Sequence, residues 1–182
     1  MGEPFASQAF NVTPDILTMA KAVTNGVMPL GAVASREKIY DTILESSPTG
    51  AIEFFHGYTY SAIPVSMAAG LAMQSIIEKE NLFERSKKMS PYFLDGLFSL
   101  KDIDGITDIR GYGMMGGIDI TLDERPGKAG YGCFKKLFEA GLSLKATGDC
   151  LIVAPPFVSE EHHIDEIIEK LRTGITNYFK TK

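Results

Sequence analysis

Apolar and polar positions divide the chain into two regions with different patterns. In the first region, residues 15–19 and 31–35 are short, almost entirely apolar runs, and the loop between them is rich in small and turn-forming residues. Runs of this kind suit strands that are covered on both faces, as in a parallel sheet between layers of helices. A short helical pattern follows over residues 36–46, and Pro64 suits the first turn of a helix that continues to about Lys79.

The second region begins with a helical pattern from Leu82 to Leu100. Pro91 lies inside this pattern and is expected to kink the helix or to split it near Ser90, because proline cannot donate a backbone hydrogen bond. Apolar and polar residues alternate loosely over residues 106–120, around a glycine-rich stretch, which indicates two strands or one bulged strand. Residues 123–130 indicate a polar loop.

The last third of the chain repeats helix, strands, helix. The pattern predicts a helix over Tyr131–Ala140 that Gly141 ends, and strands over Leu142–Ala146 and Leu151–Ala154. Ser159 is the expected N-cap of a final amphipathic helix. This α+β layer has enough apolar positions to bury a core of its own.

The two regions together predict an α/β protein with two parts. Residues 1–75 suit the end of a larger domain, because two strands with one or two helices cannot cover both sheet faces or protect the sheet edges. Residues 76–182 suit a small C-terminal α+β domain. We expect the chain to be a truncated, proteolysed or independently encoded C-terminal portion of a longer protein.

Composition and charge narrow the class of protein. The chain has 182 residues and a net charge of -5, without a basic stripe, so electrostatics give no case for nucleic-acid binding. The apolar runs are too short to span a bilayer, and no signal peptide opens the chain, which predicts a cytoplasmic protein without membrane contact. The two cysteines, Cys133 and Cys150, form no disulfide framework and have no metal-site spacing, so both are expected to be buried thiols.

Candidate chemistry begins with Lys21, which directly follows the first apolar run. A lysine held at the end of a strand can form a Schiff base with an aldehyde if its amine is desolvated enough to lose its proton. The competing interpretation is a lysine that ends a strand and reaches solvent.

Four blocks of sequence decide between these interpretations. They are residues 14–33 around Lys21, residues 56–64 (His-Gly-Tyr-Thr-Tyr-Ser-Ala-Ile-Pro), the glycine-rich residues 110–118, and residues 147–156 (Thr-Gly-Asp to Pro-Pro). In this order they resemble the C-terminal part of class III (omega-type) aminotransferases, which use pyridoxal 5'-phosphate. Among these, the resemblance is closest to the omega-amino acid:pyruvate branch. It implies the end of an incomplete fold-type I large domain, followed by the small domain.

The resemblance also implies roles for individual residues. Lys21 would hold pyridoxal phosphate and transfer the proton during transfer of an amino group from an omega-amino acid or amine to a keto acid such as pyruvate. Thr59, beside Tyr58, would bind the cofactor phosphate across the interface of a homodimer with shared active sites; alternatively, Thr59 or Ser61 caps the following helix. Lys145 stands where many relatives carry an arginine that binds the substrate carboxylate, and it is equally well interpreted as a solvated strand residue.

The same resemblance implies groups that this chain does not supply. In the family, the N-terminal portion provides an aromatic residue stacked on the cofactor ring, a backbone cradle for the phosphate and an aspartate that pairs with the pyridine nitrogen. The isolated chain is therefore expected to be inactive and to bind little cofactor. Two alternatives stay open: a non-catalytic module that retains dimerisation and packing surfaces, or a pyridoxal-phosphate aminomutase or decarboxylase. No metal site is expected, because the adjacent His162 and His163 should point apart on a helix.

Overall fold

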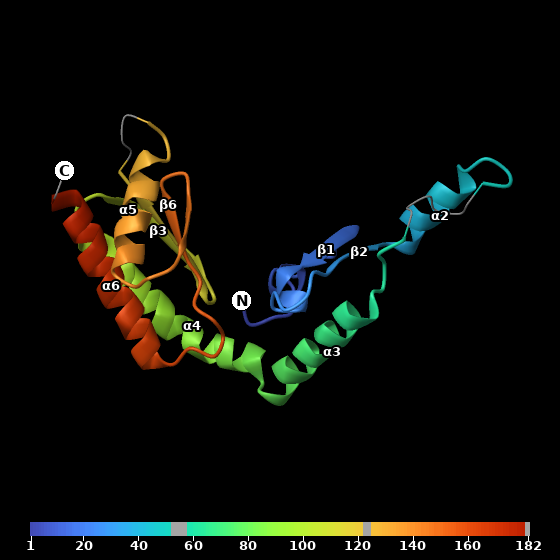
Figure 1. Ribbon diagram of the computed structural model, residues 1–182, viewed down its shortest axis with the longest axis horizontal. Coiled ribbons are helices and arrows are strands. Elements are labelled where there is room, and N and C mark those ends of the chain that lie inside the picture. The colour runs from blue at the N-terminus through green and yellow to red at the C-terminus, as the bar shows by residue number, and fades with distance from the viewer. Residues whose placement is uncertain (52–57, 122–124, 181–182) are drawn as a thin grey trace. The chain divides into compact units, whose positions relative to one another are not determined.

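A computed structural model describes residues 1–51, 58–121 and 125–180, and the chain forms two compact units (Figure 1). The lysine unit comprises Phe10–Asn81. The C-terminal unit joins Met1–Ala9 to Leu82–Lys182. The assignment of residues 1–75 to a larger domain and of residues 76–182 to a small one stays a prediction. Within the described residues, every helix is too short or too polar to cross a membrane.

The lysine unit contains a two-stranded sheet, β1 (Ile16–Ala20) and β2 (Gly31–Ser35), followed by α2 (Glu37–Glu45) and α3 (Pro64–Lys79). Both predicted strands and both predicted helices are thus confirmed. The strands pair antiparallel, with Ile16 opposite Ser35 and Ala20 opposite Gly31. The parallel arrangement expected from their apolar sequence is wrong for this pair, because a parallel crossover needs a connection of roughly a dozen residues or more, longer than the turn between β1 and β2.

Neither strand of this sheet is covered on both faces within the unit. All residues of β2 are exposed, including Val33 at 69%, and those of β1 alternate between exposed and half-buried. At the far end of the sheet, the guanidinium of Arg36 donates to the carbonyls of Thr13 and Pro14 and pairs with Asp15 at 3.1 Å. The hairpin is therefore held by its ends more than by buried side chains.

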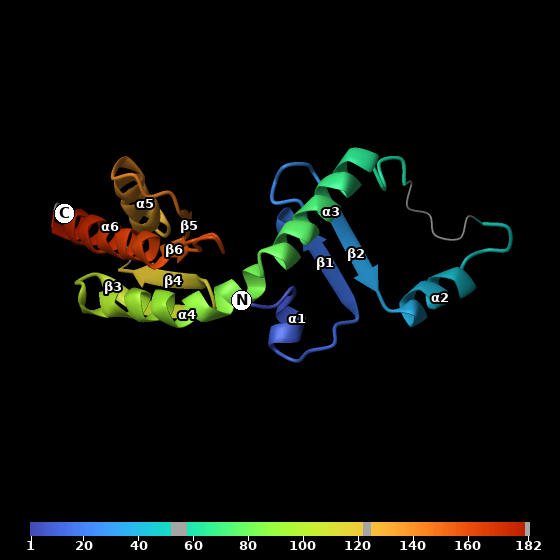
Figure 2. The same cartoon turned by 90° about the horizontal axis from the view of Figure 1, so that it is seen from below.

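The C-terminal unit is a four-stranded antiparallel sheet with the order β3-β4-β6-β5, packed against helices (Figures 1 and 2). Its strands are β3 (Ile106–Tyr112), β4 (Met115–Ile120), β5 (Lys145–Thr147) and β6 (Cys150–Val153). Its helical segments are α1 (Ala6–Ala9), α4 (Leu82–Phe98), η2 (Ser99–Asp102), α5 (Lys128–Glu139) and α6 (Glu161–Lys180). Of the two alternatives for residues 106–120, two strands or one bulged strand, the structure shows two paired strands.

One face of this sheet carries the core of the unit. Gly116, Ile118 and Ile120 alternate inward along β4, and the neighbouring strands continue the buried rows with residues such as Leu151. The core also contains Phe93, Leu97, Leu100, Cys133, Leu137, Ile164, Leu171 and Ile175 from the helices. A β-carbon on Gly116 would lie 2.1 Å from Leu97 Cδ2, so the glycine lets α4 pack directly on the sheet. The unit therefore buries a core of its own, as the sequence predicts.

Four local predictions differ from the structure. The strand predicted over Leu142–Ala146 begins only at Lys145, as β5. The helix α4 continues through Pro91 without a break, because Phe93 and Leu97 beyond the proline are fully buried and hold its second half in place. The helix α5 begins at Lys128, within the predicted polar loop. The last helix begins at Glu161, which places its N-cap at Glu160 rather than Ser159.

Candidate functional site

Lys21 lies at the end of β1, where the chain leaves the sheet. It begins a single 3-10 turn, η1 (Lys21–Val23), and its side chain is exposed. Its backbone φ is 55°, in the left-handed region that residues with a β-carbon rarely adopt. The strand therefore delivers an accessible amine from a backbone position that the loop must hold in place.

Strained backbone positions gather in the two segments that the sequence singles out. Among the described residues, the non-glycine positions with positive φ are Asn11, Asn25 and Asn81, and also Lys21, Tyr58 and Ala62. Asparagine adopts this region readily, whereas lysine, tyrosine and alanine do so at an energetic cost. Such strain persists only where the surrounding structure enforces it, and it is frequent at functional sites.

Contacts within the lysine unit show what holds the loop after Lys21. The buried hydroxyl of Thr24 donates to the carbonyl of Met28 at 2.5 Å and closes the loop internally. From α3, the hydroxyl of Ser66 donates to the carbonyl of Pro29 at 3.0 Å. Gly70, also on α3, faces the same loop, since a β-carbon there would be in ordinary van der Waals contact with Leu30 and with the carbonyl oxygen of Val23, at 3.5 and 3.7 Å. The small residues of α3 thus fasten the lysine loop to the helix.

Tyr58 and Thr59 lie in the turn that leads into the same helix. Both are exposed, and the carbonyl of Tyr58 accepts a hydrogen bond from the amide of Ser61 at 3.0 Å. The N-cap of α3 is Ile63, without a side-chain hydrogen bond, so the alternative in which Thr59 or Ser61 caps this helix is wrong. Residues 56 and 57, which open this block, lie outside the described residues. One helix therefore connects the lysine loop with the Tyr58–Thr59 turn.

Lys145 belongs to the C-terminal unit, on the open face of its sheet. It stands opposite Ile152 of β6, which in turn is opposite Gly117 of β4, and Gly117 is opposite Arg110 of β3. The side chain is exposed and forms no ion pair with the described residues. The structure thus gives Lys145 an accessible charge on a flat surface, and leaves its role a prediction.

Arg110, the other cation in this row, is neutralised by carboxylates. It pairs with Asp108 at 2.7 Å and with Asp119 at 2.6 Å, and the guanidinium lowers the pKa of Asp119. These contacts give Arg110 a structural role within the sheet. The thiol of Cys150 lies 3.6 Å from this guanidinium and is only half-buried, so the expectation of a buried thiol is wrong for Cys150. It is correct for Cys133, whose pKa is raised to about 12 by burial.

Asp149 has a role that the sequence did not indicate. Its carboxylate accepts hydrogen bonds from the amides of Gly127 at 2.7 Å and Gly130 at 2.9 Å, at the start of α5. A β-carbon on Gly130 would lie 2.2 Å from the carbonyl oxygen of Gly148, so the missing side chain of Gly130 lets the first turn of α5 approach Asp149. The Thr147–Asp149 turn that follows Lys145 is therefore fixed to the first turn of α5.

Comparison with known proteins gives the lineage of these features. The sequence pattern of class-III aminotransferases matches residues 1–175. The chain belongs to the class-III aminotransferase family. It is similar to the omega-aminotransferase of Caulobacter vibrioides (41% identity over 175 residues, covering 94% of this chain and 39% of the relative) and to the beta-alanine–pyruvate aminotransferase of Pseudomonas aeruginosa (38% identity, 93% and 38% covered).

Solved structures of transaminases share the fold of this class-III chain. One is a thermostable (S)-enantioselective omega-transaminase from Thermomicrobium roseum, with a TM-score of 0.85 and 29% identity over 97% of this chain and 40% of that one. Another is a thermostable omega transaminase engineered for the synthesis of bulky amines, with a TM-score of 0.90 and 27% identity. The chain spans about 40% of the length of the relatives it matches. The predicted α/β class and the family resemblance are thereby confirmed.

Proposed function

We propose that this class-III chain supplies the C-terminal portion of an aminotransferase that moves an amino group from an omega-amino acid or amine to a keto acid such as pyruvate. The proposal rests on one observation above the others: an accessible lysine at the end of a strand, on strained backbone, in a loop that a helix holds in place. The names of the similar proteins, an omega-aminotransferase and a beta-alanine–pyruvate aminotransferase, support this substrate class.

We assign pyridoxal 5'-phosphate to the exposed ε-amine of Lys21, whose loop is held by the hydrogen bonds of Thr24 and Ser66. When bound, this cofactor supplies the electron sink for charge that develops at the substrate carbon. Lys21 Nζ would form the covalent attachment to the cofactor aldehyde, would yield it to the amino donor, and would then move the proton at the substrate carbon as a neutral amine. The fastened loop restricts where this amine can lie, which favours proton transfer at one position.

Thr59 and Tyr58 are the proposed phosphate-binding residues. A threonine hydroxyl and the backbone N–H groups of a turn can donate to anionic oxygens. We assign this phosphate to the active site of a second copy of the protein, so that each active site of a homodimer takes residues from two chains.

Lys145 is the proposed contact for the substrate carboxylate. Its exposed ammonium has no ion pair among the described residues, whereas Arg110 in the same row is paired with two carboxylates. A lysine offers a point charge rather than the planar fork of an arginine, so it would select the carboxylate less strictly by geometry.

A second candidate is a non-catalytic packing module, and exposed apolar side chains in the lysine unit favour it. Ile16, Val27 and Val33 are 55%, 74% and 69% exposed. These surfaces equally suit contact with the remaining part of a longer aminotransferase. Measurements of catalysis and of cofactor binding are therefore needed to distinguish the two candidates.

The deciding experiment measures amino transfer from β-alanine to pyruvate by the native gene product that contains this chain. Lys21→Arg keeps the positive charge but cannot carry the cofactor, and it is expected to lower kcat by at least about a hundredfold and to remove the visible cofactor absorbance. Lys79→Arg, at the exposed end of α3, is the matched control and is expected to retain both. An active Lys21→Arg variant would refute the role of Lys21. A native gene product without activity or cofactor absorbance would favour the packing module. Conversion of β-alanine to products without formation of alanine from pyruvate would favour a mutase or decarboxylase.

A further inference from the structure

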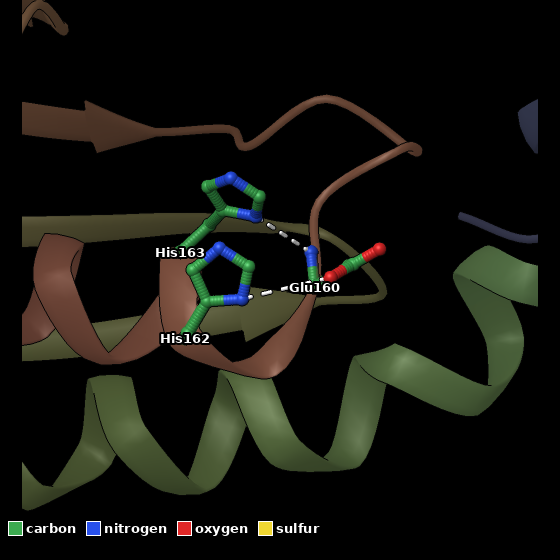
Figure 3. Close-up of side chains that lie close together, drawn as sticks. All are labelled: Glu160, His162 and His163. Carbon is green, nitrogen blue, oxygen red and sulfur yellow. Dashed lines mark hydrogen bonds and ion pairs between the residues drawn. The ribbon is translucent and has the colours of Figure 1, made fainter.

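Three potential metal ligands converge where α6 begins. Glu160, His162 and His163 each offer one ligand atom, and these atoms lie within 4.8 Å of one another (Figure 3). All three side chains are exposed. The expectation that the adjacent histidines point apart is wrong here, since their ring centroids are only 3.8 Å apart. The reason is that His163 folds back toward the helix start, where its Nδ1 accepts a hydrogen bond from the amide of Glu160 at 3.1 Å.

One pair of atoms already has the spacing of ligands around an ion. His162 Nδ1 lies 3.6 Å from Glu160 Oε2. Two ligands at the usual bond length from a tetrahedral zinc ion lie about 3.4 Å apart. The contact is an ion pair when His162 is protonated, and both atoms can serve as metal ligands when the imidazole is neutral. The ligand atom of the exposed His163 lies within 4.8 Å of both.

The carboxylate of this group is held from its outer side. Arg85 Nη2 lies 3.8 Å from Glu160 Oε1, and the same guanidinium donates to the carbonyl of Val158 at 2.8 Å. Outer contacts of this kind orient ligating carboxylates and leave the second oxygen for the ion. Glu161 and Glu166 add negative charge near the two imidazoles and oppose the positive end of the helix dipole, which would otherwise repel a cation.

We infer that Glu160, His162 and His163 form a surface binding site for a borderline divalent transition-metal ion, Zn²⁺ or Cu²⁺, separate from the proposed aminotransferase site. Two imidazole nitrogens and one carboxylate oxygen are the donor set that these ions take, with water at the open positions. The lone pair that His163 now gives to the amide of Glu160 would pass to the ion, so metal binding exchanges a helix cap for a metal bond. Binding requires neutral imidazoles and therefore weakens in acid.

The test titrates the chain with Zn²⁺ by isothermal calorimetry at neutral pH and follows the Glu160 amide by NMR. The expected result is saturable binding of one ion, with a shift of the Glu160 amide signal. His162→Gln, which leaves the hydrogen bond of His163 intact, is expected to weaken binding at least about tenfold. His56→Gln is the matched control, because it removes the chain's remaining histidine and is expected to leave the affinity unchanged.

One further variant, at Glu160, keeps the proposal open to refutation. Glu160→Gln keeps the shape of the side chain but removes its negative charge, and it is expected to weaken binding. Circular dichroism checks that α6 is intact in each variant. The site would be overturned if the wild type and His162→Gln bound Zn²⁺ with equal affinity. It would also be overturned if His56→Gln lost as much affinity as His162→Gln. Absence of saturable Zn²⁺ and Cu²⁺ binding by the wild type would overturn it as well.

Discussion

The left-handed backbone at Lys21 makes a prediction that separates the amine from the conformation that carries it. At φ 55° a β-carbon is disfavoured, whereas glycine adopts this region freely. Lys21→Ala and Lys21→Gly both remove the amine, and they differ only in the β-carbon. We therefore expect Lys21→Gly to be the more stable of the two, although neither can hold the cofactor.

The size of the difference follows from the penalty for left-handed backbone. A residue with a β-carbon loses about 1–2 kcal/mol there relative to its ordinary region. Glycine loses part of that advantage through the greater freedom of its unfolded chain, a term of about 0.5–1 kcal/mol. The net expectation is a gain of roughly 1 kcal/mol for glycine over alanine, which corresponds to about a fivefold smaller opening constant.

Hydrogen exchange of peptides from β1 and β2 measures this opening constant locally. The matched control is Gln74, an exposed residue in the middle of α3 in the same unit. There Gln74→Gly is expected to be less stable than Gln74→Ala by about 1 kcal/mol, so the sign reverses between the two sites. If glycine destabilises relative to alanine at Lys21 as well, the lysine is not held in a strained conformation and the reasoning fails.

Three predictions concern the C-terminal unit. Asp149→Ala removes the acceptor for two amides at the start of α5 and is expected to lower the free energy of unfolding by about 1–2 kcal/mol, measured by urea denaturation, with Asp149→Asn losing less. Pairing with Arg110 lowers the pKa of Asp119 below its ordinary value of 3.8. The ion pair therefore contributes fully to the free energy of unfolding at neutral pH, and this contribution is lost as the pH falls below that value. Acid denaturation of Arg110→Ala should lack this pH-dependent loss of stability. Pro91→Ala restores a backbone donor inside α4 and is expected to raise stability by up to about 3 kcal/mol, seen as a higher Tm; an unchanged Tm would show that the helix already accommodates the proline.

The sequence predicts most elements correctly because their periodicity is local. The apolar runs before and after the Lys21 loop become β1 and β2, and Pro64 begins α3 at the expected residue. What the pattern cannot contain is the pairing between elements. An apolar strand can have the same sequence in a parallel and in an antiparallel sheet. The short connection between β1 and β2, rather than their composition, determines the antiparallel pairing.

The site could be predicted only in part for the same reason. Lys21 and Thr59 are indicated by motif, whereas the contacts of Ser66 and Gly70 with the lysine loop join residues far apart in the sequence. The sequence places the N-cap of α6 one residue early, at Ser159 rather than Glu160, because serine is the better N-cap by composition. The side chain of His163 fills the capping role instead, and only coordinates reveal that it turns back over His162.

The central claim is that the ε-amine of Lys21 carries pyridoxal phosphate. Borohydride reduction of the native gene product, followed by proteolysis and mass spectrometry, fixes the cofactor to whichever side chain holds it. The account predicts a pyridoxyl group on the peptide that contains Lys21, and none after Lys21→Arg. A pyridoxyl group on a different lysine, with the Lys21 peptide unmodified, would contradict it.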